Sequence, residues 1–335
     1  MKKRDNYLDL LKGIGIFLVV LGHHDTYLGK YIYSFHMPLF FFISGIFHSN
    51  YKSYREFIEN KLRKLVYPYF ILAFSLFLFW IIIGRKFGES AIKKTPIVVS
   101  FKGIFLGNDI NNISSMEWGL PLWFLLCLFI VSNLYYFISK LEIKYILFCN
   151  IILGIVGYYL SKDTYFLFRI WHFDTALIAI NFYTLGNLLR NKIFDKKLEK
   201  IPVSILVLIA FLSVVGNEIN GRIDMHGIYY SNILLFYLNA ILGIAFIFIC
   251  IKKISLKSIV LEYMGLNTII ILAYHGRMMT FIKFILIIVL KINYPEDNLI
   301  LNIVFSIIQI LLCIPIIFIF NRYLPFFIGK EKVRI

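Results

Sequence analysis

The chain has 335 residues, of which 60% are hydrophobic and only 16% are charged, with a formal net charge of +16. A water-soluble globular protein carries roughly 25% charged residues, so this composition argues against a soluble enzyme. The surface of a membrane protein that faces lipid is apolar, and lipid headgroups attract cationic loops, so the composition indicates an integral membrane protein that binds lipid rather than nucleic acid. Its apolar runs are continuous rather than alternating, which indicates an all-α protein.

Continuous apolar runs recur along the whole chain, and a membrane-spanning helix needs about 20 such residues. We predict a polytopic bundle of about ten transmembrane helices, at residues 8–23, 31–48, 65–84, 119–138, 145–160, 168–189, 202–216, 231–251, 264–290 and 299–320. The run 264–290 is long and is expected to tilt or to break near Gly276. No separate soluble region interrupts the runs, so residues 1–335 are predicted to form a single transmembrane domain.

Basic residues between the runs predict the orientation. Ten spans place both termini on one side, where the segments hold 22 Lys and Arg residues against ten on the other side. Cytoplasmic segments carry this excess, so we predict that both termini are inside. The longest outer segment, residues 85–118, is either a solvated connector or a cover over a cavity, and the sequence leaves both open.

The first apolar run carries a polar stripe formed by Asp9, Lys12 and His23. Lys12 and His23 are eleven residues apart, which returns to within about 20° of the same helix face and spans about 16 Å along the axis. The stripe would therefore join the inner membrane edge to the outer half of the protein. The alternatives are a helix-start role for Asp9, snorkelling of Lys12 to the interface, and an interfacial helix-end role for His23.

Small residues in the same run favour close helix packing. Gly13, Gly15 and Gly22 lack a side chain, so another helix can approach the first run there.

Further ionisable residues lie in later runs, where burial in lipid is costly and usually marks a functional position. These second-tier or substrate-contact candidates are His36, His172, Asp174, His275 and Arg277. The histidines come from separate runs without HxxxH or HExxH spacing, and no GxSxG occurs, so neither a metal site nor a serine nucleophile is expected. A membrane-embedded histidine acting as general base, beside cationic groups, is the chemistry that remains.

Six stretches carry a family resemblance, in the family's own order. They are LDLLKGIGIFLVVLGH at 8–23, FHMPLFFFISGIF at 35–47, KLRKLVYPYF at 61–70, LWFLLCLFIVSNLYY at 122–136, FDTALIAINFYTLGNLLR at 173–190 and LAYHGRMM at 272–279. Together they resemble the membrane-bound acyltransferase-3 family and, within it, the fucose 4-O-acetylase-like acetyltransferases. This resemblance implies a bundle of about ten helices in the bacterial cytoplasmic membrane.

The resemblance also implies an activity and a set of site residues. Members take an acyl group, usually acetyl from acetyl-CoA as a substrate at the cytoplasmic side, and pass it to a hydroxyl of a cell-surface sugar or glycolipid. The family's essential histidine corresponds to His23 and its basic partner to Lys12, where many members carry an arginine with a bidentate fork that lysine lacks. Arg63 and Lys64 would lie near the donor's phosphates.

We therefore expect an O-acetyltransferase without a permanently bound cofactor, in which His23 is the base and Asp9 and Lys12 support it. Direct transfer and an acyl-histidine intermediate both remain open, and the oligomeric state is not readable. One alternative is a carrier or flippase for a lipid-linked sugar or small solute, although no two-halved repeat with matching broken segments is found. The other alternative is a non-catalytic partner protein in glycan assembly.

Overall fold

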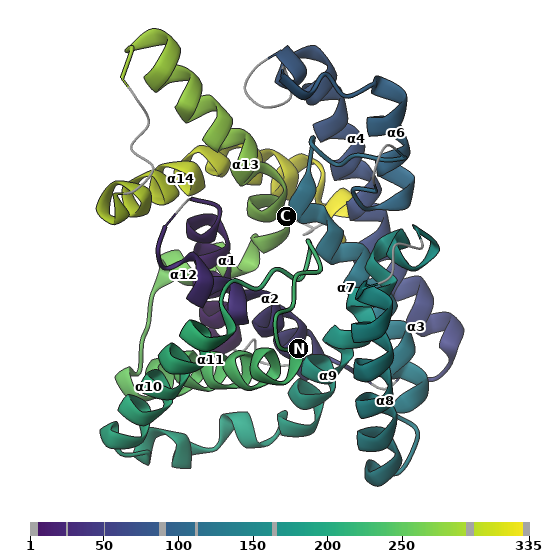
Figure 1. The fold of residues 1–335 in the computed structure, drawn as a ribbon, viewed down its shortest axis with the longest axis vertical. Helices are drawn as coiled ribbons and strands as arrows, with labels where there is room; N and C mark the ends of the chain where they lie inside the picture. Colours follow the sequence, from purple (N-terminus) through teal and green to yellow (C-terminus); the bar gives the residue numbers. More distant parts are fainter. Residues whose placement is uncertain are drawn as a thin grey trace. The chain divides into compact units, whose positions relative to one another are not determined.

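The computed structural model describes residues 6–24, 26–49, 51–86, 92–110, 113–162, 166–292 and 298–330. Within these ranges the regular structure is helical, with two isolated β-bridges and no strand (Figure 1). The predicted all-α class is therefore confirmed.

Seven helices in the described part of the chain are long and apolar enough to cross a membrane. They are Tyr54–Lys86, Leu120–Ile138, Ile143–Lys162, Val203–Asn220, Ile233–Ile254, Thr268–Val289 and Leu299–Tyr323. Three other predicted spans form the helices α1 (Asn6–Gly22), α2 (Gly29–Ile46) and α9 (Phe173–Leu189), of 17, 18 and 17 residues. The chain is thus a multi-pass membrane protein, and the count of ten spans and the orientation stay predictions.

The remaining elements follow in chain order and complete the description of the helices. They are α3 (Tyr54–Lys61), a π-helical turn (Leu62–Val66), α4 (Tyr67–Ile82), α6 (Ile97–Leu106), α7 (Trp123–Ile138), α8 (Ile143–Lys162), α10 (Val203–Asn220), α11 (Ile233–Ile254), α12 (Ile259–Leu266), α13 (Thr268–Phe284), a second π-helical turn (Ile285–Val289) and α14 (Leu299–Tyr323). Short 3₁₀ turns lie at Gly84–Lys86, Leu120–Leu122, Phe166–His172, Lys192–Phe194, Lys196–Lys200 and Pro325–Ile328.

The chain divides into two compact units, and each is described by itself. The first unit comprises Met1–His48, Asn181–Thr268 and Pro295–Ile307. The second unit comprises Ser49–Ile180, Ile269–Tyr294 and Ile308–Ile335.

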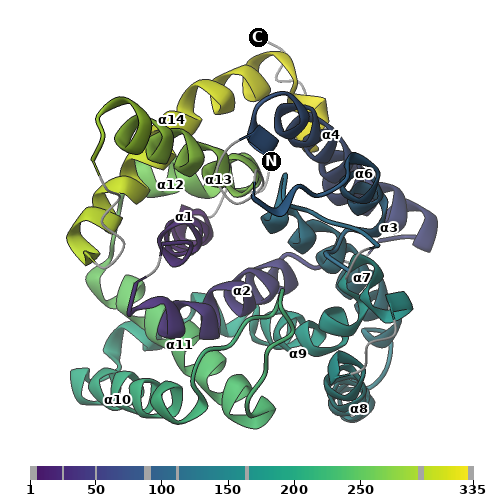
Figure 2. The same cartoon turned by 45° about the horizontal axis from the view of Figure 1, so that its top comes forward.

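In the first unit, α1 packs along α12 and against α2, and α10 and α11 lie side by side (Figures 1 and 2). Glycines create the α1–α12 contact, because a Cβ at Gly13 would lie 2.0 Å from the Leu261 carbonyl oxygen. A Cβ at Gly265 would lie 1.9 Å from the carbonyl oxygen of Asp9. The predicted close approach at Gly13 is therefore confirmed, and it is backbone against backbone.

In the second unit, α4 and α6 lie side by side in both views (Figures 1 and 2). The Tyr69 hydroxyl donates to the Ile104 carbonyl oxygen at 3.0 Å, and the Trp118 indole N–H donates to the Ser100 carbonyl oxygen at 3.0 Å. The segment 85–118 thus contains a packed helix rather than a solvated connector alone. Residues 87–91 and 111–112 of that segment lie outside the described residues.

Two helices lie within their predicted runs but begin later than the runs do, at Thr268 in the run 264–290 and at Phe173 in the run 168–189. The run 264–290 breaks at Asn267, between α12 and α13, and Gly276 lies inside α13. The Asn267 side-chain amide donates to the Tyr263 carbonyl oxygen at 2.8 Å, which ends α12 locally. In the run 168–189, α9 begins only at residue 173, because Trp171 and His172 both have positive φ, at 55° and 56°.

Large apolar side chains cover the outer faces of several helices. Phe211 and Ile219 of α10 are 62% and 69% exposed, and Phe148 and Ile151 of α8 are 62% and 60% exposed. Such a surface is costly in water and natural against lipid chains. The exposed faces therefore agree with a membrane location.

Candidate functional site

Asp9 and Lys12 form an ion pair on α1, with 2.5 Å between the Lys12 Nζ and the Asp9 Oδ1. The Asp9 side chain is only 7% exposed and that of Lys12 22% exposed. The Lys12 Nζ also lies 5.6 Å from the centroid of the Phe47 ring. Each charge is therefore compensated within the helix that carries it, which lowers the cost of burying both.

His23 follows the last residue of α1 and is exposed, in a turn that leads toward α2. Its ring centroid lies 6.4 Å from that of Tyr33, with 73° between the ring planes. His36 contacts the same tyrosine, at 5.0 Å and 71°. Tyr33 is thus in edge-on contact with both imidazoles, and it links two histidines that the sequence proposed separately.

His36 is buried on α2, and its Nδ1 lies 2.8 Å from the Ile32 carbonyl oxygen. A carbonyl only accepts, so Nδ1 carries the proton, and Nε2 is the acceptor nitrogen when this ring is neutral. Its burial distinguishes His36 from the exposed His23.

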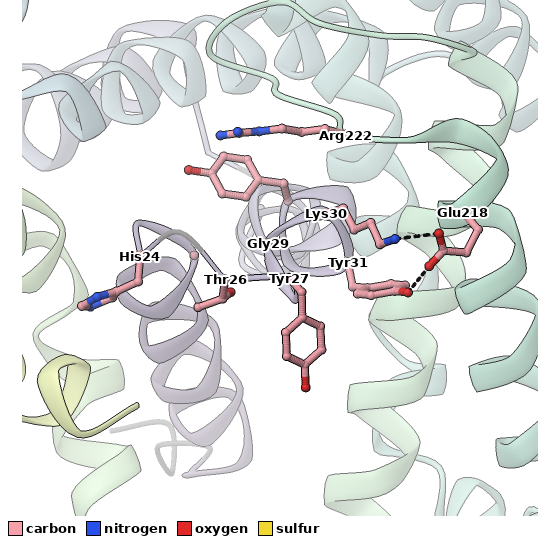
Figure 3. Close-up of a pocket in the computed structure, with 10 residues that line it drawn as sticks. His24, Thr26, Tyr27, Gly29, Lys30, Tyr31, Glu218 and Arg222 are labelled. Carbon is pink, nitrogen blue, oxygen red and sulfur yellow. Dashed lines mark hydrogen bonds and ion pairs between the residues drawn. The ribbon is translucent and has the colours of Figure 1, made fainter. Parts of the chain in front are cut away.

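A cavity of about 500 Å³ lies beside this group (Figure 3). Its walls come from the turn after α1, the start of α2 and the end of α10 with the loop behind it. Gly22 and His24 both line it, and they are the two neighbours of His23 in the chain. Tyr33 lines it as well, so the cavity adjoins both the backbone and the ring contact of His23.

Charged groups in this cavity are held in place by one another. Figure 3 shows Lys30 and Tyr31 reaching the Glu218 carboxylate, with 2.6 Å between the Lys30 Nζ and Oε2, and the Tyr31 hydroxyl donating to Oε1. The Arg222 guanidinium lies 5.3 Å from the centroid of the Tyr33 ring. Sequence reasoning missed Tyr33, Glu218 and Arg222, because no local spacing joins the start of α2 to the end of α10.

Arg63 and Lys64 lie in the second unit, in the π-helical turn between α3 and α4. The Arg63 guanidinium lies 5.7 Å from the Phe326 ring centroid, and its buried Nε has no hydrogen-bond partner among the described residues. Gly329, at φ +69°, packs its backbone against Lys64, which is exposed. Such π-turns often mark functional positions, because they present a side chain that a regular helix would turn away.

His172 and Asp174 are fully buried at the start of α9, also in the second unit. The His172 ring lies 4.8 Å from the Trp123 ring. The Asp174 Oδ1 accepts from the Thr175 backbone N–H at 2.6 Å, as expected for a carboxylate in the first turn of a helix. His172 and Asp174 are therefore part of the packed interior of the second unit.

His275 and Arg277 share α13 but have different partners. The His275 Nδ1 lies 2.9 Å from the Ile271 carbonyl oxygen, and the ring is buried. The Arg277 Nη2 donates to the Glu117 backbone carbonyl at 2.6 Å, while the Glu117 carboxylate accepts from the Thr95 hydroxyl. Arg277 therefore holds the segment 85–118, which contains α6, against α13.

A family comparison supports an acyltransferase among the classes that the sequence left open. A family model described as an acyltransferase domain, acyltransferase-3, matches residues 5–322. The chain belongs to the acyltransferase-3 family. Comparison with curated proteins and comparison with solved structures give no match. The predicted family is confirmed, and the fucose 4-O-acetylase-like subgroup stays a prediction.

In this acyltransferase the candidate residues fall into two groups. Asp9, Lys12, His23 and His36 lie in the first unit with the cavity. The others, Arg63, Lys64, His172, Asp174, His275 and Arg277, lie in the second unit. Among the described residues, no three His, Cys, Asp or Glu side chains converge in a way that could hold a metal ion.

The contact of Arg277 gives a testable stability effect. We expect Arg277→Met to speed amide hydrogen exchange in the peptide 92–110 by at least about tenfold, because a hydrogen bond from a charged group contributes about 1.5–3 kcal/mol. Arg322→Met is the matched control, since Arg322 is an exposed arginine at the end of α14. Equal exchange in the two variants would show that Arg277 does not hold this segment.

Proposed function

We propose that this acyltransferase moves an acetyl group from cytosolic acetyl-CoA to a hydroxyl of a carbohydrate or glycolipid in the bacterial cell envelope. One observation carries the proposal: in a member of an acyltransferase family, an exposed imidazole follows the first helix, and the residues on either side of it line a cavity. A binding space beside an exposed general base is the arrangement that hydroxyl acylation requires.

The proposed chemistry begins with a hydroxyl that is a poor nucleophile at neutral pH. Neutral His23 accepts the hydroxyl proton while the oxygen attacks the thioester carbonyl carbon. The carbon–sulfur bond then breaks, the acetyl group stays on the acceptor oxygen as an ester, and the departing CoA thiolate takes the proton from the imidazolium. This step needs no further co-reactant.

Lys12 and Asp9 support this reaction at the inner end of the polar stripe. The Lys12 ammonium attracts the negative charge of the donor, and its ion pair with Asp9 limits the positions that the amine can adopt. His36 acts through Tyr33, since both imidazoles contact that ring. We therefore propose His36 as a positioning residue rather than as the base.

Arg63 and Lys64 are the proposed contacts for the donor's phosphates. The buried Arg63 Nε makes no hydrogen bond among the described residues, so its N–H is available to a phosphate oxygen. Lys64 is exposed next to it. A guanidinium can bind a phosphate through two parallel hydrogen bonds, which makes arginine well suited to this task.

The donor contact predicts a selective kinetic effect. We expect Arg63→Met to raise the KM for acetyl-CoA about tenfold, the size of one lost charge-assisted hydrogen bond, with little change in the acceptor dependence. Methionine keeps an apolar stem against Phe326. Arg55→Met is the control, because the Arg55 side chain is 88% exposed and paired with Glu59. A KM for acetyl-CoA that is the same in both variants would remove Arg63 from the donor site.

The function itself is tested in cells with and without the protein. The envelope carbohydrates and glycolipids are extracted and analysed for ester-linked acetyl groups by mass spectrometry. We expect one acetylated species to disappear when the protein is absent and to return with the wild-type chain. An unchanged set of acetyl esters would contradict the proposed function.

A further inference from the structure

The cavity beside His23 contains two kinds of group that the reaction chemistry above does not use. Tyr27 is 67% exposed although it lines the cavity, so its ring face is open to a ligand. Glu218 and Arg222 are exposed as well and bring one carboxylate and one guanidinium. In the view of Figure 3, Arg222 and Tyr27 lie at opposite edges of the group.

The carboxylate of Glu218 is held in a fixed orientation. Lys30 and Tyr31 are adjacent on α2, and each donates a hydrogen bond to one of the two carboxylate oxygens. A carboxylate has about four acceptor positions, so acceptor capacity remains for hydroxyl groups of a ligand. The side chain is 51% exposed, which leaves that capacity accessible.

Arg222 supplies the complementary donors. Its guanidinium lies over the Tyr33 ring, a contact that fixes its plane while its N–H groups extend from the edge of that plane. The cavity thus offers acceptors at Glu218, donors at Arg222 and an aromatic face at Tyr27.

A sugar ring matches this combination. Its hydroxyl groups both donate and accept hydrogen bonds, and its C–H faces are apolar and pack on aromatic rings. The volume of about 500 Å³ lies within the range of small-molecule sites. The multiply anionic acetyl-CoA fits less well, because Lys30 is paired with Glu218 and Arg222 is then the one cation left among the described lining residues for several phosphates.

We infer that this cavity holds the sugar ring of the acceptor, with Tyr27 stacking on the ring and Glu218 and Arg222 binding its hydroxyl groups. The inference rests on the proposed function and names the acceptor subsite for it. Gly22 and His24 line the cavity on either side of His23 in the chain, and Tyr33 lines it while contacting the His23 ring, so the bound ring lies near the segment that carries the proposed base.

The test uses the full chain in lipid vesicles, with radiolabelled acetyl-CoA as donor. Two acceptor probes are prepared from cells that lack the protein: the water-soluble carbohydrate and the solvent-extracted glycolipid. The probe that becomes labelled identifies which source carries the sugar. Initial rates are then measured against the concentration of that probe and against the concentration of acetyl-CoA.

We expect Tyr27→Ala to raise the half-saturating acceptor concentration roughly two- to tenfold, because a ring contact contributes about 0.5–1.5 kcal/mol. We expect Glu218→Gln to raise it about tenfold. In both variants kcat and the KM for acetyl-CoA stay within about twofold of the wild type. Tyr27→Phe keeps the ring and is expected to behave like the wild type.

Tyr229→Ala is the matched control, since Tyr229 is 61% exposed in the same unit and does not line the cavity. Equal acceptor dependence in Tyr27→Ala, Glu218→Gln and Tyr229→Ala, with label still transferred, overturns this inference and leaves the proposed function intact. Failure of the wild-type protein to label either probe overturns both. An increase in the KM for acetyl-CoA alone would assign the cavity to the donor and also overturn the inference.

Discussion

Replacing His23 by alanine is expected to lower the rate of acetyl transfer by about 10²- to 10⁴-fold, the range that a general base contributes. The side chain is exposed at the end of α1, so its removal opens no core cavity and leaves the amount of folded protein unchanged. The measurement is the transfer of radiolabelled acetyl by equal amounts of wild-type and variant protein. A selective loss of rate would separate a chemical role from a role in the fold.

His226→Ala is the matched control, because His226 lies in the same unit, in the loop after α10, and neither of its chain neighbours lines the cavity. We expect its rate to stay within about twofold of the wild type. If His23→Ala and His226→Ala transfer acetyl equally well, His23 is an interfacial helix-end residue, and the reaction has another base.

Gly13→Ala is expected to destabilise the protein by about 2 kcal/mol or more. The new Cβ would lie 2.0 Å from the Leu261 carbonyl oxygen, a distance at which the backbones of α1 and α12 must separate. Separation would also move Asp9, whose carbonyl oxygen lies against Gly265 across the same helix pair. We expect the unfolding midpoint in detergent to fall by roughly 5 °C.

The control for this substitution is Gly276→Ala on α13, where a Cβ meets nothing within 4 Å. Alanine stabilises a helix interior by up to about 1 kcal/mol relative to glycine, so this variant is expected to unfold at the wild-type temperature or above. A midpoint for Gly13→Ala as high as that of Gly276→Ala would contradict the close α1–α12 contact.

The sequence predicted helices well wherever an apolar run had polar ends. The run 202–216 corresponds to α10 (Val203–Asn220), which starts after Pro202. The break at Asn267 was not predicted, because apolar residues continue on both sides of it. A hydropathy pattern does not reveal a single side-chain hydrogen bond to the backbone. The helix α6 was missed as well, since its ten residues are too few to span a membrane and resemble a loop.

The site was predictable only where its residues share one helix. The spacing of Asp9 and Lys12, three residues apart, places both on one face, and the structure joins them. The residues of the cavity were not predictable in this way. Lys30 and Glu218 are 188 residues apart and meet only because α2 packs near α10. No periodic pattern encodes such a contact, so Tyr33, Glu218 and Arg222 required the structure.

The central claim, that this chain is an enzyme whose base is His23 beside the cavity, is tested most directly by the purified protein in vesicles. Radiolabelled acetyl-CoA and the carbohydrate extracted from cells lacking the protein are supplied together, and the label on the carbohydrate is measured for the wild type and His23→Ala. We predict an acetyl ester on the carbohydrate with the wild type and at least about 10²-fold less with the variant. Translocation of the carbohydrate without any transfer of label would contradict the account and identify a carrier.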